Sequence, residues 1–182
     1  SSSIKKYYEL FKGKNVNIID ENNPNLNQIL CQTDILINFV SALAFEPEIR
    51  KFEAIRFIQK ISVGISKARI SKIINISSQS VYNQNENISK SEFSEVKFDS
   101  SYSFQKLIIE DLFKSIKEYS PLTSVISFRL PRVIIPSIPN QAGFFGKIIQ
   151  EYIEGNTVKI ENPLNNTNLI HIKDVVSAID FI

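Results

Sequence analysis

Apolar residues fall into two patterns that alternate along the chain. Short continuous apolar runs are typical of strands buried on both faces. Longer stretches with apolar residues every three or four positions predict amphipathic helices. The predicted strands are 16–19, 34–40, 72–76, 124–130 and 168–172. The predicted helices are 4–11, 23–32, 47–68, 102–119 and 143–154, with a final helix capped by Asp174.

The two longest helices carry most of the predicted core. The inward positions of the helix at 47–68 are Ile49, Phe52, Ile55, Ile58 and Ile61, and those of the helix at 102–119 are Leu107, Ile108, Leu112 and Ile116. After Pro131 the hydrophobic pattern becomes irregular, and residues 132–143 are predicted to form a proline-rich loop. Strands and helices in this alternation predict the α/β class, with a doubly wound parallel sheet covered by helices on both faces. We expect a Rossmann-like nucleotide-binding domain over 1–130 and part of a substrate-binding region over 131–182.

Composition narrows the possible functions. The chain has 182 residues and a net charge of +2, which gives no electrostatic case for nucleic acid or a membrane surface as a partner. Cys31 is the single cysteine and His171 the single histidine, so neither a disulfide nor a metal site is expected. We expect Cys31 to be a small buried residue, His171 to have a structural or supporting role, and the protein to be cytoplasmic. The absence of methionine indicates an internal fragment or omitted residues.

Three polar residues form the candidate catalytic group. Ser78 lies just after the predicted strand at 72–76. Tyr102 and Lys106 lie four positions apart at the start of a predicted helix, so both project from one face. A tyrosine brought from its usual pKa near 10 to about 7 needs about 4 kcal/mol of phenolate stabilisation, which a nearby ammonium can supply in part. Such a group removes a proton from an alcohol while a nicotinamide accepts the hydride. A second Tyr-x-x-x-Lys, at Tyr8 and Lys12, reads as ordinary helix surface because no serine-ending strand precedes it.

These motifs resemble those of the extended short-chain dehydrogenases/reductases, also called NAD-dependent epimerase/dehydratases. The resemblance rests on "DILINFVSA", "IINISSQSVY", "SYSFQKLIIEDL", "ISFRLPRVIIP" and "NLIHIKDVVSAI", and it covers most of the chain. It implies that Tyr102 is the catalytic base, that Lys106 lowers the pKa of Tyr102 and holds the nicotinamide ribose, and that Ser78 orients the substrate hydroxyl.

The resemblance also implies a cofactor, NAD, with NADP possible. Val40, Ser41 and Ser77 join Tyr102 and Lys106 as expected cofactor contacts. Asp20 follows either the second strand, where a carboxylate bonds the adenosine ribose, or the third strand, near the adenine. The glycine-rich turn that approaches the pyrophosphate is missing, and the near match at Gly143 and Gly146 lies in the wrong half of the chain.

The expected substrate is a nucleotide sugar, contacted by Ser78, Gln79 and Arg132. The dehydratase branch carries Thr-Asp-Glu where this chain has Ser78, Gln79 and Ser80, so a 4,6-dehydratase is disfavoured and an epimerase or a 4-keto reductase is expected. Other family positions also differ: Glu53 and Arg56 stand near an expected asparagine, and Ile134–Ile135 replace Tyr-Gly. The family further implies a homodimer through the helices at 47–68 and 102–119. The alternatives are a non-catalytic dinucleotide- or sugar-nucleotide-binding module and a structural scaffold.

Overall fold

The computed structural model describes residues 22–82, 89–135, 144–158 and 168–182. The helices are α2 (Leu26–Cys31), α3 (Glu48–Ile65), α4 (Ser101–Tyr119), α5 (Phe144–Ile153) and α6 (Ile172–Phe181), with the 3-10 turn η1 (Gln79–Val81). The strands are β1 (Ile35–Asn38), β2 (Lys72–Ser78), β3 (Ser124–Leu130), β4 (Arg132–Ile134) and β5 (Leu169–His171). The predicted helix at 4–11, the predicted strand at 16–19 and Asp20 lie outside the described residues.

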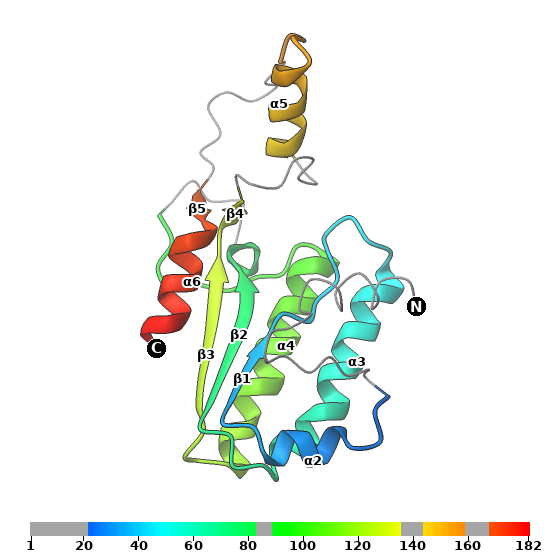
Figure 1. The fold of residues 1–182 in the computed structure, drawn as a ribbon, viewed down its shortest axis with the longest axis vertical. Helices are drawn as coiled ribbons and strands as arrows, with labels where there is room; N and C mark the ends of the chain where they lie inside the picture. The colour runs from blue at the N-terminus through cyan, green and yellow to red at the C-terminus, as the bar shows by residue number, and fades with distance from the viewer. Residues whose placement is uncertain (1–21, 83–88, 136–143, 159–167) are drawn as a thin grey trace, which may run out of the picture.

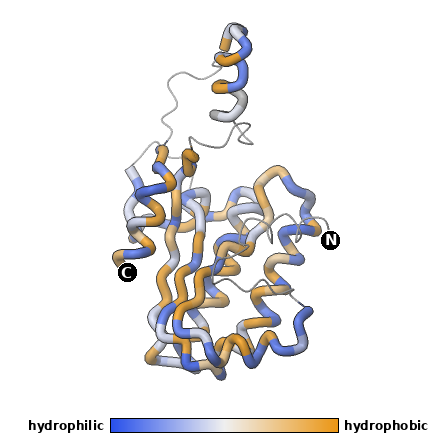
Figure 2. The backbone as a smooth tube through the Cα atoms, viewed as in Figure 1, coloured by the Kyte–Doolittle hydropathy of each residue, from blue (hydrophilic) through white to orange (hydrophobic). Residues whose placement is uncertain are grey.

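The main sheet is parallel, with strand order β1-β2-β3 (Figure 1), which confirms the predicted α/β class. Each connection between these strands passes through a helix, α3 between β1 and β2 and α4 between β2 and β3. Such crossovers are what parallel pairing requires. The strands are largely hydrophobic along their length (Figure 2). Because β1 and β2 run in parallel, their carboxyl ends meet at one edge of the sheet.

A row of polar side chains crosses the three strands at one level of the register. Asn38, Asn75 and Ser127 are paired positions on β1, β2 and β3. The Asn38 amide donates to Asn75 Oδ1 at 2.8 Å, and the Asn75 amide donates to Ser127 Oγ at 3.2 Å. Asn75 is 1% exposed, so a shift of any strand would leave a buried amide without its partner. The row therefore fixes the register of the sheet.

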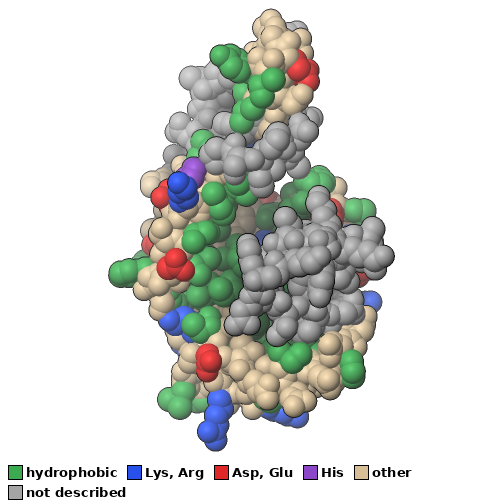
Figure 3. Space-filling model, in the orientation of Figure 1, with side chains coloured by type: hydrophobic (Ala, Val, Ile, Leu, Met, Phe, Trp, Pro, Cys, Tyr) green, Lys and Arg blue, Asp and Glu red, His purple; other side chains and the backbone are tan. Residues whose placement is uncertain are grey.

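Helices lie on both faces of this sheet. The α4 face holds the main core, in which Ile58 from α3, Ile73 from β2 and Phe113 from α4 are fully buried. Lys72 points to the opposite face from its neighbour Ile73 and donates to the carbonyl of Ile182, so the end of α6 lies on that second face. Hydrophobic side chains gather on the viewed face beside α6 (Figure 3).

The two long helices form as predicted, but their buried faces differ from the prediction. On α3, Ile58 and Ile61 are buried as expected, whereas Ile49 and Phe52 are 58% and 50% exposed. These two lie on the side of α3 opposite to its buried positions, since Lys51 and Ala54 in the same turns are buried. On α4, Ile116 is buried as expected, but the other predicted positions are only half-buried. Those positions are Leu107, Ile108 and Leu112, and the buried apolar residues beside Ile116 are Ile109 and Phe113.

The buried face of α4 differs from the prediction because polar side chains are buried on it. Gln105, Lys106 and Glu110 occupy the inward face together with Ile109 and Phe113, so hydrophobicity alone assigns the wrong centre to this face. Cys31 was also predicted wrongly. It is exposed, because it ends the short helix α2, whose only buried residue is Leu30.

The C-terminal part differs from the prediction in two places. Arg132–Ile134 was predicted as a loop but forms β4, which pairs in parallel with β5. Its partner strand lies more than thirty residues further along the chain, and no local sequence pattern predicts such a pairing. Asp174 was predicted to cap α6, but the N-cap is His171, whose Nδ1 accepts from the backbone N–H of Lys173 at 3.2 Å. His171 thus has the expected structural role. Helix α5 stands apart from the sheet (Figure 1).

Within the described ranges, none of the helices combines the length and apolar character that crossing a bilayer would need.

Candidate active site

The predicted catalytic residues come together at the carboxyl edge of the sheet. Ser78 is the last residue of β2, and Tyr102 and Lys106 lie in the first two turns of α4. This helix begins at a defined place, because Ser100 is its N-cap and exchanges hydrogen bonds with Ser103 in a capping box. The carboxyl edge is where open α/β sheets bind their ligands.

Ser78 and Tyr102 are in direct contact. A side-chain hydrogen bond from Ser78 lowers the pKa of Tyr102, but burial of the phenol has the larger effect and raises that pKa above its usual value. The phenol is therefore protonated at neutral pH in this structure. The expected fall of the Tyr102 pKa is not produced by the described residues alone.

Lys106 is buried beside the tyrosine, and its ammonium is hydrogen-bonded to two protein groups. Its Nζ lies 5.8 Å from the centroid of the Tyr102 ring and donates to Ser41 Oγ at 2.9 Å and to the carbonyl of Ile76 at 2.8 Å. Burial lowers the pKa of Lys106 to about 8, and the charge of Glu110 opposes this fall. Lys106 therefore links the start of α4 to β2 and to the loop that follows β1.

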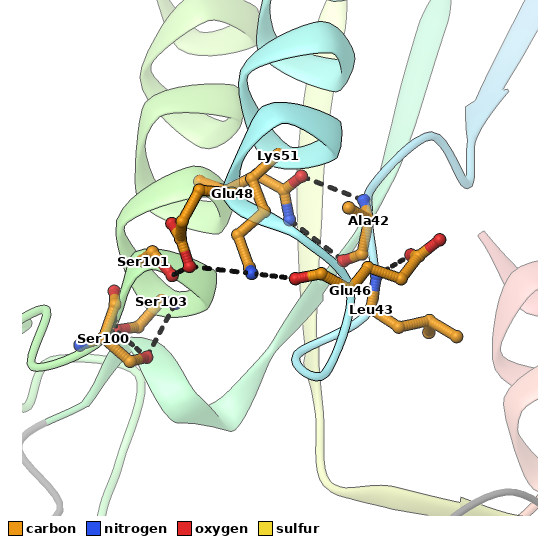
Figure 4. A network of polar contacts seen from close by, with 9 residues as sticks. Ala42, Leu43, Glu46, Glu48, Lys51, Ser100, Ser101 and Ser103 are labelled. Carbon is orange, nitrogen blue, oxygen red and sulfur yellow. Dashed lines mark hydrogen bonds and ion pairs between the residues drawn. The ribbon is translucent and has the colours of Figure 1, made fainter.

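That loop, residues 39–47, is held in place by polar contacts with α3 and α4. Lys51 Nζ donates to the carbonyl of Glu46 at 2.7 Å and to Glu48 Oε1 at 3.2 Å (Figure 4). The hydroxyl of Ser101, in the first turn of α4, donates to the same Glu48 oxygen at 2.8 Å. Hydrogen bonds from Ser101 and Lys51 lower the pKa of Glu48. The network joins the loop to the first turn of the helix that carries Tyr102.

Gln105 is a buried polar residue of the candidate site that sequence reasoning missed. Its side chain is completely buried and bonds both backbone groups of Ala42: the Ala42 N–H donates to Oε1 at 2.9 Å, and Nε2 donates to the Ala42 carbonyl at 3.1 Å. Gln105 thereby fixes the loop one residue from Ser41. The signal in the sequence was a polar residue directly before Lys106 on the inward side of a helix.

Replacing Gln105 by leucine, which keeps the volume, is expected to lower the free energy of unfolding by about 2 kcal/mol, because two buried backbone groups of Ala42 lose their partners. Urea denaturation followed by circular dichroism measures this change. Gln59→Leu, at an exposed position of α3, is the matched control and is expected to change stability by less than about 0.5 kcal/mol. Equal effects of the two substitutions would show that the Gln105 contacts contribute nothing.

A cavity of about 870 Å³ opens beside the same loop. Its lining includes Val40 and Ser41, which were predicted as cofactor contacts, and three cationic side chains from α3, namely Arg50, Arg56 and Lys60. A cavity of this size accommodates a ligand larger than a single sugar ring. Ser41 lines the cavity and also accepts from Lys106, so the cavity lies next to the candidate catalytic group.

The other predicted site residues are placed as follows. Gln79 opens η1, directly after Ser78. Ser77 is 4% exposed and its hydroxyl donates to Glu110, on the face of β2 opposite to Ser78. Arg132 opens β4, in the two-stranded sheet. Asp20 lies outside the described residues. Among the residues that the structure describes, no cluster of histidine, cysteine or acidic side chains could hold a metal ion.

Comparison with known proteins gives one family match and several structural likenesses. The model of the NAD dependent epimerase/dehydratase family matches residues 31–182. The comparison with curated proteins returns no match.

Three solved structures illustrate the structural likeness. The UDP-N-acetylglucosamine 4-epimerase from Methanobrevibacter ruminantium M1, in complex with UDP-N-acetylmuramic acid, superposes with a TM-score of 0.75 at 23% identity, over 88% of this chain and 54% of that one. The UDP-glucuronic acid 4-epimerase from Bacillus cereus, in complex with NAD, gives 0.76 at 19% identity, over 96% and 58%. The NAD-dependent NDP-hexosamine 5,6-dehydratase TunA, involved in tunicamycin biosynthesis, gives 0.70 at 16% identity, over 85% and 52%. The chain thus shares their fold and spans little more than half of their length.

Proposed function

Because the chain belongs to the NAD-dependent epimerase/dehydratase family, we propose that it carries the catalytic group of an NAD-dependent sugar-nucleotide epimerase. The observation that supports this most directly is the contact between Ser78 and Tyr102 beside the buried ammonium of Lys106. The structural relatives named above include two enzymes described as UDP-sugar 4-epimerases, one of them solved with NAD. A 4-keto reductase uses the same chemistry in one direction only and is the second form of this proposal.

The residues present suit a nicotinamide cofactor. Val40 and Ser41 line the cavity at the carboxyl edge of the sheet, and Lys106 reaches Ser41. We assign to Val40, Ser41 and Lys106 the binding of the nicotinamide half of NAD, with NADP as the alternative. When bound, this cofactor accepts a hydride and returns it. Asp20 and Ser77 remain proposed cofactor contacts. We also propose that residues 1–130 form the nucleotide-binding part, and that residues 131–182, including Arg132, belong to a substrate-binding region.

In this proposal each catalytic side chain has a defined task. Ser78 hydrogen-bonds the sugar hydroxyl that reacts, and Gln79 lies next to it along the chain. Once the Tyr102 phenol has lost its own proton to solvent, its oxygen takes the proton of that hydroxyl as the hydride leaves, and it returns this proton to the keto oxygen in the reverse step. Lys106 supplies positive charge beside the phenolate that forms, where low polarity strengthens the interaction.

The proposal is tested by incubating the purified chain with NAD and, in parallel, UDP-glucose, UDP-N-acetylglucosamine and UDP-glucuronic acid, with separation of the 4-epimers by chromatography. Interconversion of one pair is the expected result. NADH consumption with a 4-keto nucleotide sugar, without epimerisation, would identify the reductase form. Binding of NAD or a UDP-sugar without any turnover would favour the non-catalytic binding module, and no thermal shift with either would favour a scaffold.

We also propose a cytoplasmic homodimer. Ile49 and Phe52 lie exposed on α3, together with Val63, which is 61% exposed. Apolar side chains in this number on one helix are typical of an interface. Light scattering at micromolar concentration tests the association, and a monomer would contradict it.

A further inference from the structure

A partly buried ion pair lies on the α4 face of the sheet, one helical turn beyond Lys106. Arg129 on β3 donates from Nη2 to Glu110 Oε2 at 2.8 Å, and its Nε lies 3.2 Å from both carboxylate oxygens. The exposed fraction is 10% for the Glu110 side chain and 23% for Arg129. The proposed chemistry does not require this pair, so its presence at this place calls for a reason.

The Glu110 carboxylate also binds the strand that carries Ser78. The hydroxyl of Ser77 donates to Glu110 Oε1, and Ser77 and Arg129 are register partners on β2 and β3. One side chain of α4 is therefore tied to two strands at the same level. Since Ser78 follows Ser77 directly, its position relative to α4 depends on this link.

Arg129 extends the connection to the other side of Ser78. Its guanidinium carbon lies 5.0 Å from the centroid of the Tyr82 ring, and the two side chains are also hydrogen-bonded. Tyr82 is 7% exposed and closes η1, the turn that starts after Ser78. The backbone N–H of Ser80, within this turn, donates to Ser78 Oγ at 3.2 Å. The residues on both sides of Ser78 are thus anchored to the same ion pair.

We propose that Glu110 is a positioning residue which, through Ser77 and Arg129, holds Ser78 against Tyr102. The inference rests on the proposed function, because only there do Ser78 and Tyr102 react. A buried ion pair is weak evidence for stability, since apolar residues of the same size often stabilise a fold as well. Apolar residues cannot replace the directed hydrogen bonds that the Glu110 carboxylate accepts from three donors on two strands. That property suits a place where two side chains on different elements must keep a fixed separation.

The charge of Glu110 bears on the same site, because Glu110 follows Lys106 by four residues and shares its face of α4. The titratable and charged groups that face this cluster, among the described residues, are Tyr102 on α4, Arg129 on β3 and Tyr82 at the end of η1. The loop after β1 contributes the uncharged Ser41. Removing the carboxylate would leave the Arg129 charge without its acidic partner beside this cluster.

The test compares Glu110→Gln, which keeps the size of the side chain, with Asp111→Asn, the same change at the next, exposed position of α4. Hydrogen exchange followed by mass spectrometry is measured on the full chain without ligand. We expect exchange over residues 77–82 to rise about tenfold in Glu110→Gln, as the loss of about one hydrogen bond predicts, with no change in Asp111→Asn. Exchange over 109–116, in the core part of α4, is expected to stay the same in both variants.

Turnover gives the second measurement. Glu110→Gln is expected to lower kcat about tenfold with KM within about twofold, which is less than the roughly 10²-fold cost of a 1 Å misplacement. If Glu110→Gln does not fold, Glu110→Asp, which keeps the charge but shortens the reach, replaces it. Unchanged exchange over 77–82 and unchanged kcat in a folded variant would overturn the proposal. If the wild-type chain shows no turnover, the proposed function fails, while the exchange measurement still decides whether Glu110 holds the end of β2.

Discussion

Replacing Tyr102 by phenylalanine is expected to lower kcat by roughly 10³-fold, within the range that a positioned acid–base group contributes. The substitution removes one oxygen, the atom that hydrogen-bonds with Ser78 and that would exchange a proton with the substrate. It leaves the ring, which lies 5.8 Å from Lys106 Nζ, in place. The Kd for NAD, measured by fluorescence titration with NADH or by calorimetry, is therefore expected to change less than about threefold.

Tyr119→Phe is the matched control, because Tyr119 ends the same helix and is 75% exposed. We expect its kcat and its Kd for NAD to equal those of the wild type. A Tyr102→Phe variant that kept full turnover would exclude the assigned role of the phenol. A variant that lost NAD binding as well would show that the oxygen serves the cofactor and not the proton transfer.

The second large expected effect is a rise in the free energy of unfolding with pH, caused by the buried Lys106. Burial lowers the pKa of Lys106 to about 8 in the folded protein, from 10.5 in the unfolded chain. Between these two values the unfolded state binds more protons than the folded state, so the free energy of unfolding rises with pH. The rise contributed by Lys106 is up to about 3 kcal/mol across this window. Below pH 8 Lys106 is charged in the folded protein, and burial of this charge lowers the free energy of unfolding by the full amount.

Lys106→Met is expected to lose this rise. Urea denaturation at pH 7.5, 8.5 and 9.5 measures it as the difference in slope between the variant and the wild type. Lys114→Met, at an exposed position of the same helix, is expected to keep the wild-type slope. Parallel curves for Lys106→Met and the wild type would contradict the lowered pKa. The catalytic loss expected for Lys106→Met, about 10²-fold, follows from the missing positive charge beside the phenolate.

Much of the fold followed from hydrophobic pattern alone. The apolar runs at 34–40, 72–76 and 124–130 each contain the strand that was observed, because a strand covered on both faces must be apolar throughout. Both long helices were predicted because a helix covered on one side carries apolar residues at every third or fourth position. Ser78, Tyr102 and Lys106 were recognised because their spacing fits a strand end followed by a helix start, and the structure brings all three to one edge of the sheet.

Features that depend on partners distant in the chain could not be predicted. β4 forms only because β5 returns to it. Gln105, Glu110 and Arg129 look like surface residues in the sequence, since burial of a polar side chain becomes favourable only when the fold supplies its partners. The direction of the Tyr102 pKa depends on the fold in the same way, because burial of the phenol raises this pKa and the hydrogen bond from Ser78 opposes the rise.

The polar row across the sheet has an evolutionary consequence. Ser41 follows Asn38 by three residues, and Ser78 follows Asn75 by three. Ser41 and Ser78 therefore lie at the same distance along the chain from two residues that are paired in the sheet. An insertion or deletion of one residue within either three-residue stretch would shift a site residue relative to the other strand, and we expect selection to remove it.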